Sequence, residues 1–438
     1  MQMASKIPPG LVLLSVSWVS LSAITPPNQA PPVQNPPVIA IRAGHVVDVE
    51  AGSVRDNQVI LVEGGRIKSI SAGPPPAGAR VIDLSGSYVL PGLIDAHSHL
   101  GMTTIASRDA DRLLFSSLLE PTASRAIQGV AHLRTMLESG FTTVRDLGNA
   151  GNFADTALRR GVEEGWIPGP TMINAGRIIA PFGGQFRLQP EKPDLAEPEY
   201  FVADTVDEIR KAVRQNIHYG ARVIKLVIDE RWYIYSEADV RAAVTEAGPR
   251  LKVAAHVNTN DGALNAVRGG VATIEHLQPL RDETLTLMKE RNVYLVPIVF
   301  PVGSYAGVSP AMYKQVVERL KRAHAIGTPL AFGADVTYYR EGRTRGELTL
   351  DHLQSFVDAG IPAADILRIM TINAARAVGV EARRGLLKEG QAADIVAVPA
   401  NPLSDPQTLR KVSFVMKDGV VYKTDGKFTW EPARKIGR

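Results

Sequence analysis

The chain has no cysteine among its 438 residues. This absence excludes disulfide bonds and a lipid anchor on an N-terminal cysteine. The chain also has little excess of either charge, because its formal net charge is only +4. No Lys/Arg cluster is interleaved with aromatic residues. We therefore expect no nucleic-acid partner. Hydrophobic residues make up 45% of the chain and charged residues 21%, which predicts a globular protein with a substantial core.

Residues 1–37 differ in pattern from the rest of the chain. Lys6 precedes an apolar run at 11–21, and small residues follow at 22 and 23. This layout is typical of a secretory signal peptide and is short for a membrane span; an uncleaved anchor is the alternative. A Pro-rich spacer follows to residue 37. We expect an exported protein, periplasmic or secreted, with no stable membrane insertion after signal cleavage.

From residue 91 to 384, strand-like and helix-like segments alternate. After a first strand that ends near residue 99, strand candidates cover 141–146, 171–178, 223–228, 252–256, 272–276, 293–299 and 330–335. Helix candidates cover 122–138, 154–164, 206–219, 237–247, 262–268, 283–291, 311–325 and 347–358, and a further one covers 363–378. Eight strands each followed by a helix predict an α/β fold of the (β/α)8 TIM-barrel type. A doubly wound open sheet is the alternative, but no Gly-rich phosphate turn follows an early strand.

Two short β-rich regions, 38–90 and 385–438, flank the predicted barrel. The first is in a size range where a domain buries little surface by itself. Because chain termini commonly lie near each other, we expect the two regions to pair into one small composite β-sandwich in which the barrel is inserted.

The stretch 89–99 reads Val-Leu-Pro-Gly-Leu-Ile-Asp-Ala-His-Ser-His. Alternate side chains of a strand point to the same face, so His97 and His99 converge. Neutral imidazole suits zinc and similar ions. A pair of surface histidines is the alternative for an isolated His-x-His.

Further chemistry-bearing residues stand at other strand ends, where barrel active sites form. Lys225 lies inside the apolar run 222–228, and a buried ammonium is costly without a partner. Carbamylation by CO2 would turn it into an anionic ligand that bridges two cations. His256, His276 and Asp335 end three later strands. Each residue alone could be structural, but their coincidence favours a metal centre.

This arrangement of His-x-His, Lys, His, His and Asp on strands one, four, five, six and eight resembles the amidohydrolase superfamily. Segments 89–99 and 390–396 are similar to sequence motifs of this superfamily. Segments 140–146 and 273–276 resemble the group of imidazolonepropionase-like proteins and binuclear Xaa-Pro dipeptidases. The resemblance covers roughly residues 38–425.

The resemblance implies two divalent metal ions, most suitably zinc. Six side chains would hold them: His97, His99, Lys225, His256, His276 and Asp335. The first two histidines and Asp335 would hold one ion, the other two histidines the second, and carboxylated Lys225 would bridge them with a hydroxide. Asp335 would accept a proton and return it to the leaving amine. His276 counts as catalytic through the ion that polarises the scissile carbonyl.

Candidate substrate residues follow strands three and four. Tyr233 and Tyr235 can reach the barrel mouth, where a phenol such as Tyr233 could donate to the developing oxyanion; packing of an aromatic loop is the alternative. Arg231 could bind a substrate carboxylate, or it could simply be exposed. Gln185 stands where relatives often carry histidine, which puts a neutral amide near the substrate carbonyl.

These observations predict a metal-dependent amidohydrolase that cleaves an amide bond next to a free carboxylate, in a dipeptide or an N-acyl amino acid. A cyclic amidase like imidazolonepropionase is one rival, although that reaction usually goes with one metal and no strand-four lysine. A lactone or ester hydrolase is another, because the same hydroxide attacks both bond types. A non-catalytic secreted metal-binding module is the rival from another class. The expected partner is a small-molecule substrate, and a homo-oligomer stays open.

Overall fold

A barrel of parallel strands forms the centre of the part of the chain described by this computed structural model, residues 38–110, 112–230, 233–305 and 308–431. Every side chain of β5 (Leu93–Ser98), β6 (Phe141–Asp146) and β10 (Val223–Val227) is buried. Such strands are typical of parallel sheets with both faces covered. The other barrel strands are β7 (Thr171–Asn174), β8 (Ile178–Ala180), β11 (Lys252–His256), β12 (Thr273–Glu275) and β13 (Tyr294–Val296), and β9 (Tyr200–Val202) pairs with β8.

The eighth barrel position is filled by residues 330–335, which pair without forming a regular strand. Leu330 makes a single parallel bridge to β13. On the other side, the Asp335 N–H donates to the His97 carbonyl at 2.8 Å. The barrel is closed in this way between β13 and β5, and the predicted (β/α)8 fold is confirmed.

The third predicted strand, 171–178, is divided into β7 and β8. Gly176 lies between them with φ at +71°, a left-handed conformation that glycine adopts without strain. A Cβ at this position would lie 2.6 Å from the Phe153 ring. The prediction of one continuous strand was wrong because the chain turns here.

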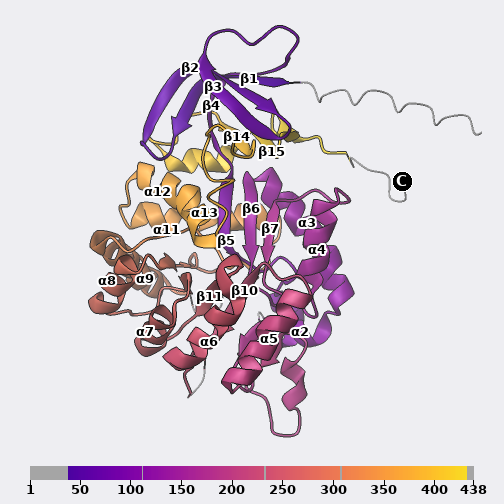
Figure 1. The fold of residues 1–438 in the computed structure, drawn as a ribbon, viewed down its shortest axis with the longest axis vertical. Coiled ribbons are helices and arrows are strands. Elements are labelled where there is room, and N and C mark those ends of the chain that lie inside the picture. Colours follow the sequence, from indigo (N-terminus) through magenta and orange to yellow (C-terminus); the bar gives the residue numbers. More distant parts are fainter. Residues whose placement is uncertain (1–37, 111, 231–232, 306–307, 432–438) are drawn as a thin grey trace, which may run out of the picture. The chain divides into compact units, whose positions relative to one another are not determined.

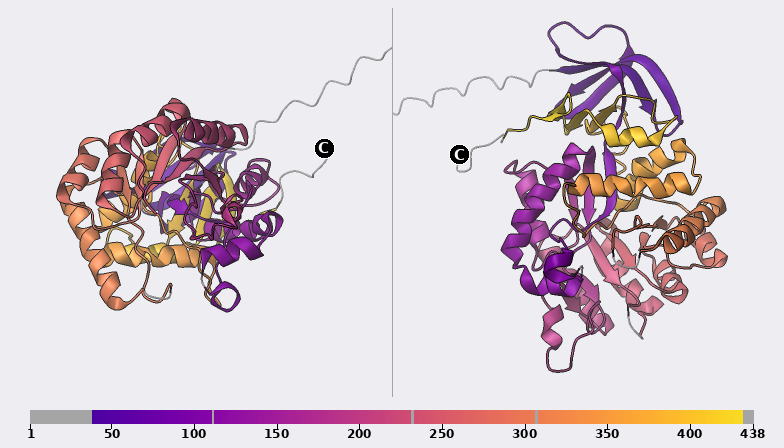
Figure 2. Two further views of the ribbon diagram at one scale, coloured as in Figure 1. Left: turned by 90° about the horizontal axis from the view of Figure 1, so that it is seen from below. Right: turned by 180° about the vertical axis from the view of Figure 1, so that it is seen from behind.

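Helices surround the barrel strands, as the left view of Figure 2 shows. They are α1 (Ala106–Asp109), α2 (Leu113–Leu119), α3 (Thr122–Glu138), α4 (Ala154–Glu163), α5 (Val206–His218), α6 (Glu237–Ala247), α7 (Asn260–Gly269), α8 (Asp282–Glu290), α9 (Pro310–Ile326), α10 (Arg345–Asp351), α11 (Leu353–Asp358), α12 (Ala363–Met370) and α13 (Ile372–Val378). The helix predicted over 363–378 is two helices, because Thr371 leaves the helical region at φ −129° and ψ −96°. Within the described residues, no helix combines the length and apolar character needed to cross a membrane.

The regions before and after the barrel join in one eight-stranded sheet. It contains β1 (Ile39–Asp48), β2 (Ser53–Glu63), β3 (Arg66–Ala72), β4 (Arg80–Pro91), β14 (Ile395–Val398), β15 (Phe414–Lys417), β16 (Val420–Thr424) and β17 (Lys427–Phe428). The antiparallel pair β4 and β14 connects the two halves, and in Figure 1 the indigo and yellow strands lie side by side. The sheet curls, since the Ile67 N–H on edge strand β3 donates to the Gln391 carbonyl just before β14 at 2.9 Å.

The passage from sheet to barrel is at Gly92. Its N–H donates to the Asp394 carbonyl at 2.9 Å. A Cβ at residue 92 would lie only 2.1 Å from Thr142 Oγ1 on β6, so the close approach of the Thr142 side chain requires glycine here. This contact fixes the position at which β5 enters the barrel and therefore helps to position the histidines at its end.

Candidate metal and active site

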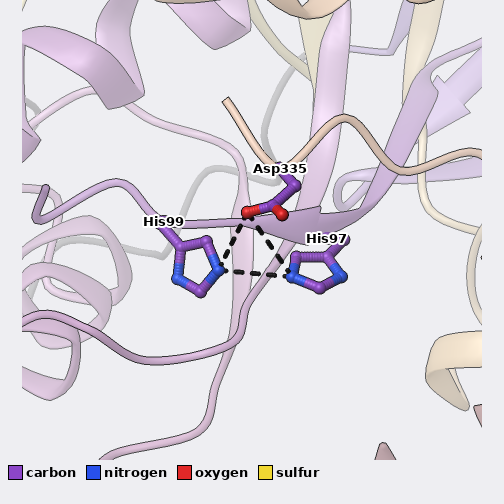
Figure 3. Close-up of side chains that lie close together, drawn as sticks. All are labelled: His97, His99 and Asp335. Atoms are coloured by element: carbon purple, nitrogen blue, oxygen red, sulfur yellow. Dashed lines mark hydrogen bonds and ion pairs between the residues drawn. The ribbon is translucent and has the colours of Figure 1, made fainter. Parts of the chain in front are cut away.

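Three side chains from adjacent barrel positions converge where β5 ends. Nε2 of His97 lies 3.2 Å from Nε2 of His99. Oδ1 of Asp335 lies 3.2 Å from the His99 nitrogen and 3.7 Å from the His97 nitrogen. In Figure 3 both rings and the carboxylate point toward one another. The structure thus brings the two histidines together, as alternation along the strand predicts.

The separations among these three groups suit one divalent cation. Two ligand atoms about 2.1 Å from a zinc ion at tetrahedral angles lie about 3.4 Å apart. The three ligand atoms all lie within 4.8 Å of one another. Burial lowers the pKa of His97 well below its ordinary value, so this imidazole is neutral and able to ligate. The donor set therefore fits a zinc-like ion.

Asp335 and His99 form a charge pair in this cluster. Burial opposes ionisation of Asp335, but His97 and His99 more than offset it and hold the pKa of Asp335 below its usual range. Burial also disfavours a charged His99, yet its hydrogen bond to Asp335 raises the pKa of His99. A divalent ion would replace the His99 proton as the partner of this carboxylate.

The backbone at Asp335 and His276 lies in the left-handed region. Their φ angles are +53° and +73°, a conformation that few non-glycine residues adopt. Such strain persists where the surrounding structure holds it, and it gathers at functional sites. For Asp335 the holding contact is the bond of its N–H to the His97 carbonyl.

A buried carboxylate and a buried guanidinium support His97 from behind. Oε2 of Glu275 lies 2.8 Å from Nδ1 of His97, and Oε1 accepts a hydrogen bond from Nη2 of Arg145 at 2.6 Å. Neither Glu275 nor Arg145 is exposed to solvent. A carboxylate on one ring nitrogen fixes the tautomer in which the other nitrogen binds a metal. This leaves Nε2 of His97 facing His99 and Asp335.

Lys225 lies on β10 and is 2% exposed. Burial lowers the pKa of its amine to about 8, with Glu275 and Asp335 opposing the shift and Arg145 adding to it. The lowered pKa increases the fraction of Lys225 that is neutral near pH 7. A neutral amine is the form that reacts with CO2.

His256 and His276 lie on the other side of the site. Their ring centroids are 4.5 Å apart, and the His276 ring is 5.4 Å from the His97 ring. His256 Nε2 donates to Oε2 of Glu230 at 2.9 Å, which leaves its Nδ1 as the nitrogen available for a metal. Burial and the neighbouring His256 lower the pKa of His276 to about 3, so this ring is neutral.

One cavity of about 320 Å3 brings these groups together. Its lining includes all six predicted metal ligands: His97, His99, Lys225, His256, His276 and Asp335. The remaining lining residues are Thr104, Leu113, Asn149, Ile178, Gln185, Glu230, Asn258, Tyr305 and Thr337. The arrangement can hold cations beside a substrate-sized space and keep an ionised carboxylate next to it.

The predicted substrate residues divide into those that line this cavity and those that do not. Gln185 lines it, and its Oε1 accepts a hydrogen bond from Tyr200 at 3.0 Å. Tyr235 is buried and its hydroxyl donates to the Ala203 carbonyl, so its predicted place at the mouth is corrected to a packing position.

Two further predictions concern the residues just before Tyr235. Tyr233 is 45% exposed, and its hydroxyl donates to the Phe182 carbonyl rather than into the cavity. Its predicted orientation toward the substrate therefore differs from the one in this structure. Arg231 lies outside the described residues.

Sequence reasoning assigned no role to Glu275, Arg145 or Glu230. A weaker signal than that of Lys225 existed for the first two, because each is a charged residue in a predicted barrel strand directly after an apolar residue, Ile274 or Val144. Glu230 lies in a loop, where charge is ordinary, so no sequence signal distinguishes it.

Comparison with known proteins places the chain among relatives that share this fold. The model of the amidohydrolase family matches residues 88–424. The chain belongs to this family. This amidohydrolase is therefore a hydrolase whose family generally uses divalent metal ions and acts on small-molecule substrates.

Three relatives illustrate the range of this amidohydrolase's neighbours. Ochratoxinase from Aspergillus niger is 28% identical over 384 residues, 79% of this chain and 78% of that protein. Imidazolonepropionase from Caldanaerobacter subterraneus subsp. tengcongensis is 25% identical over 382 residues, 81% of this chain and 86% of that protein. A crystal structure of a Xaa-Pro dipeptidase with methionine in its active site matches with a TM-score of 0.77 and 26% identity, covering 88% of this chain and 100% of that one. The predicted resemblance to the imidazolonepropionase and Xaa-Pro dipeptidase group is confirmed.

Proposed function

We propose that this amidohydrolase is an exported binuclear zinc enzyme that cleaves an amide bond next to a free carboxylate, in a dipeptide or an N-acyl amino acid. The observation that carries the proposal is the single cavity in which His97, His99 and Asp335 face Lys225 and two further histidines. The similar Xaa-Pro dipeptidase holds methionine in its active site, which supports a free amino acid as the product here.

Two metal positions follow from the donor set. His97, His99 and Asp335 would hold one ion, and His256 and His276 the other. When bound, such ions supply hydroxide at neutral pH and polarise the scissile carbonyl.

Lys225 would join the two positions after carboxylation. The neutral amine nitrogen attacks the carbon of CO2, one C–O π pair moves to oxygen, and the nitrogen loses one proton to solvent. The product is a carbamate, whose two oxygens would make Lys225 an anionic ligand for the metal centre. The lowered pKa of Lys225 supports this reaction because it raises the fraction of neutral amine.

Side chains of the protein transfer the proton between the nucleophile and the leaving amine. Asp335 is ionised and lies beside the His97 and His99 nitrogens, so it accepts the proton of the nucleophile and returns it to the leaving amine. Tyr233 would donate to the developing oxyanion once its hydroxyl leaves the Phe182 carbonyl.

A substrate screen tests this proposal. Purified, zinc-loaded protein is offered dipeptides, N-acyl amino acids, cyclic amides and lactones, and release of free amino acid is measured. We expect turnover of the first two classes. Turnover of cyclic amides or lactones alone would contradict the proposal.

Metal analysis tests the binuclear centre separately. We expect close to two zinc ions per chain in the unmodified protein and a loss of most of them in Lys225→Ala. Lys252→Ala is the matched control, because this lysine lies at the exposed start of the adjacent strand β11. One ion per chain, unchanged in Lys225→Ala, would overturn the model.

Export is tested by mass spectrometry of the protein recovered outside the cytoplasm. Cleavage between about residues 22 and 30 is expected for a signal peptide. An intact Met1 would instead indicate an anchor.

A further inference from the structure

A second, smaller cavity opens beside His276. Its volume is about 120 Å3. Its walls come from the segments that follow β12 and β13 and from one face of α9: His276, Leu277, Gln278, Ile298, Val299, Phe300, Val308, Met312, Tyr313, Val316 and Arg319. Most of these side chains are apolar, in contrast to the mainly polar lining of the metal site.

The size of the cavity defines what it can hold. An apolar cavity of roughly 150 Å3 accommodates benzene. A space of about 120 Å3 therefore suits a branched or linear side chain of about four carbons, the size of leucine or methionine. Of the wall residues Arg319 is cationic, and its Nη1 donates to the Leu277 carbonyl at 3.4 Å. The remaining walls offer a charged substrate group few partners to replace its hydration.

The position of the cavity connects it to the chemistry. His276 lines both this cavity and the metal site, whereas Asp335 lines only the metal site. In the proposed function, Asp335 would serve the leaving amine, and His276 would help to hold the ion that polarises the carbonyl. A group in the smaller cavity is thus attached on the carbonyl side of the scissile bond.

The backbone around the cavity is held in an unusual conformation. Ile298 has φ at +29° and is 5% exposed, and a β-branched residue with positive φ is a rare exception. Together with His276 at φ +73°, two of the wall residues are strained. Strain of this kind is retained where it shapes a ligand site.

We propose that this cavity is the specificity subsite for a medium-sized apolar side chain on the residue that supplies the scissile carbonyl. The inference rests on the proposed function and narrows it. The preferred substrates are dipeptides whose first residue is leucine-like or methionine-like, rather than glycine-like or acidic.

The experiment compares glycyl, leucyl and glutamyl dipeptides that share one C-terminal residue. Loss of a single methylene contact in an apolar pocket changes kcat/KM by roughly 10–200-fold, so we expect the leucyl peptide to exceed the glycyl peptide at least tenfold. In Val316→Phe, which fills the cavity, this preference should fall below threefold. Gln315→Ala, at an exposed neighbouring position of α9, should keep the preference.

A second variant guards against misfolding. Met312 lines the same cavity but is 49% exposed, so Met312→Trp can narrow the cavity without disturbing the core, and circular dichroism checks both variants. Equal rates for glycyl and leucyl peptides, or an undiminished preference in both variants, would overturn the subsite alone. No turnover of any dipeptide or N-acyl amino acid would refute the proposed function, and the subsite with it.

Discussion

Replacing Glu275 with Gln should weaken metal binding and the fold at the same time. The buried Glu275 carboxylate accepts hydrogen bonds from His97 Nδ1 at 2.8 Å and from Arg145 Nη2 at 2.6 Å. Gln keeps the shape of the side chain but removes its charge and replaces one acceptor oxygen with a donor. Either His97 or Arg145 then faces an N–H group in a site that water does not reach.

The size of both effects can be worked out. Breaking a buried ion pair by removing one partner costs about 3–5 kcal/mol. Arg145 keeps its bonds to the Ala96 carbonyl at 2.5 Å and to Thr273 Oγ1 at 3.0 Å, so we expect the lower end, about 3 kcal/mol. Loss of a carboxylate that orients a ligating histidine lowers metal affinity about 10–100-fold, which corresponds to about 1.4–2.8 kcal/mol.

Two assays separate these effects. Urea unfolding of the metal-free protein measures the free energy of unfolding, and competition with a chelator measures zinc affinity. Glu237→Gln is the control, because its partner Arg241 and Glu237 itself are 58% and 43% exposed and such pairs contribute about 0–1 kcal/mol. If Glu275→Gln retains zinc affinity and loses no more stability than the control, Glu275 does not orient His97.

Three further predictions concern other groups. Asp335→Asn should lower kcat by about 10²–10⁴-fold, the usual contribution of a general acid and base, with the circular dichroism spectrum unchanged; full turnover would place the proton transfer elsewhere. Glu230→Ala should weaken binding of the second zinc about 10–100-fold in chelator competition because His256 loses its orienting carboxylate, and Glu230→Gln, which keeps an acceptor, should recover most of this affinity; equal losses in both variants would contradict the role. Burial lowers the pKa of His352 from 6.5 to about 4, so its contribution to stability is present above pH 6.5 and is lost as the pH falls toward 4, by up to about 3 kcal/mol. As the pH falls over this range, the free energy of unfolding of His352→Leu should therefore rise relative to that of the unmodified protein, as measured by urea unfolding. A difference that does not change with pH would refute the assignment.

Much of the metal site could be predicted because strand ends obey simple geometry. Alternation along β5 and the rule that barrel sites form at C-terminal strand ends suffice to bring His97, His99 and Asp335 to one point. Lys225 stood out because a charge inside an apolar strand needs an explanation. The same reasoning, applied to Glu275, would have identified the group behind His97.

The substrate side could not be predicted in the same way. Tyr235 follows β10 closely enough to reach the cavity, yet its hydroxyl is used by the Ala203 carbonyl. Whether an aromatic side chain in a loop packs or faces a ligand depends on the neighbouring loop, here the one that carries Ala203, and not on its own sequence. The apolar cavity at Ile298 has the same origin, since its walls come from three separate segments between residues 276 and 319.

The pairing of β4 with β14 has a consequence for biosynthesis. Leu90 pairs with Val396, so this edge of β4 stays unpaired until roughly 300 further residues have been synthesised. This takes about 15–60 s at ordinary rates of translation. During that time its N–H and C=O groups offer a template for pairing with another chain. We expect the nascent protein to depend on chaperones until Val396 reaches Leu90, and release before that point to favour aggregation.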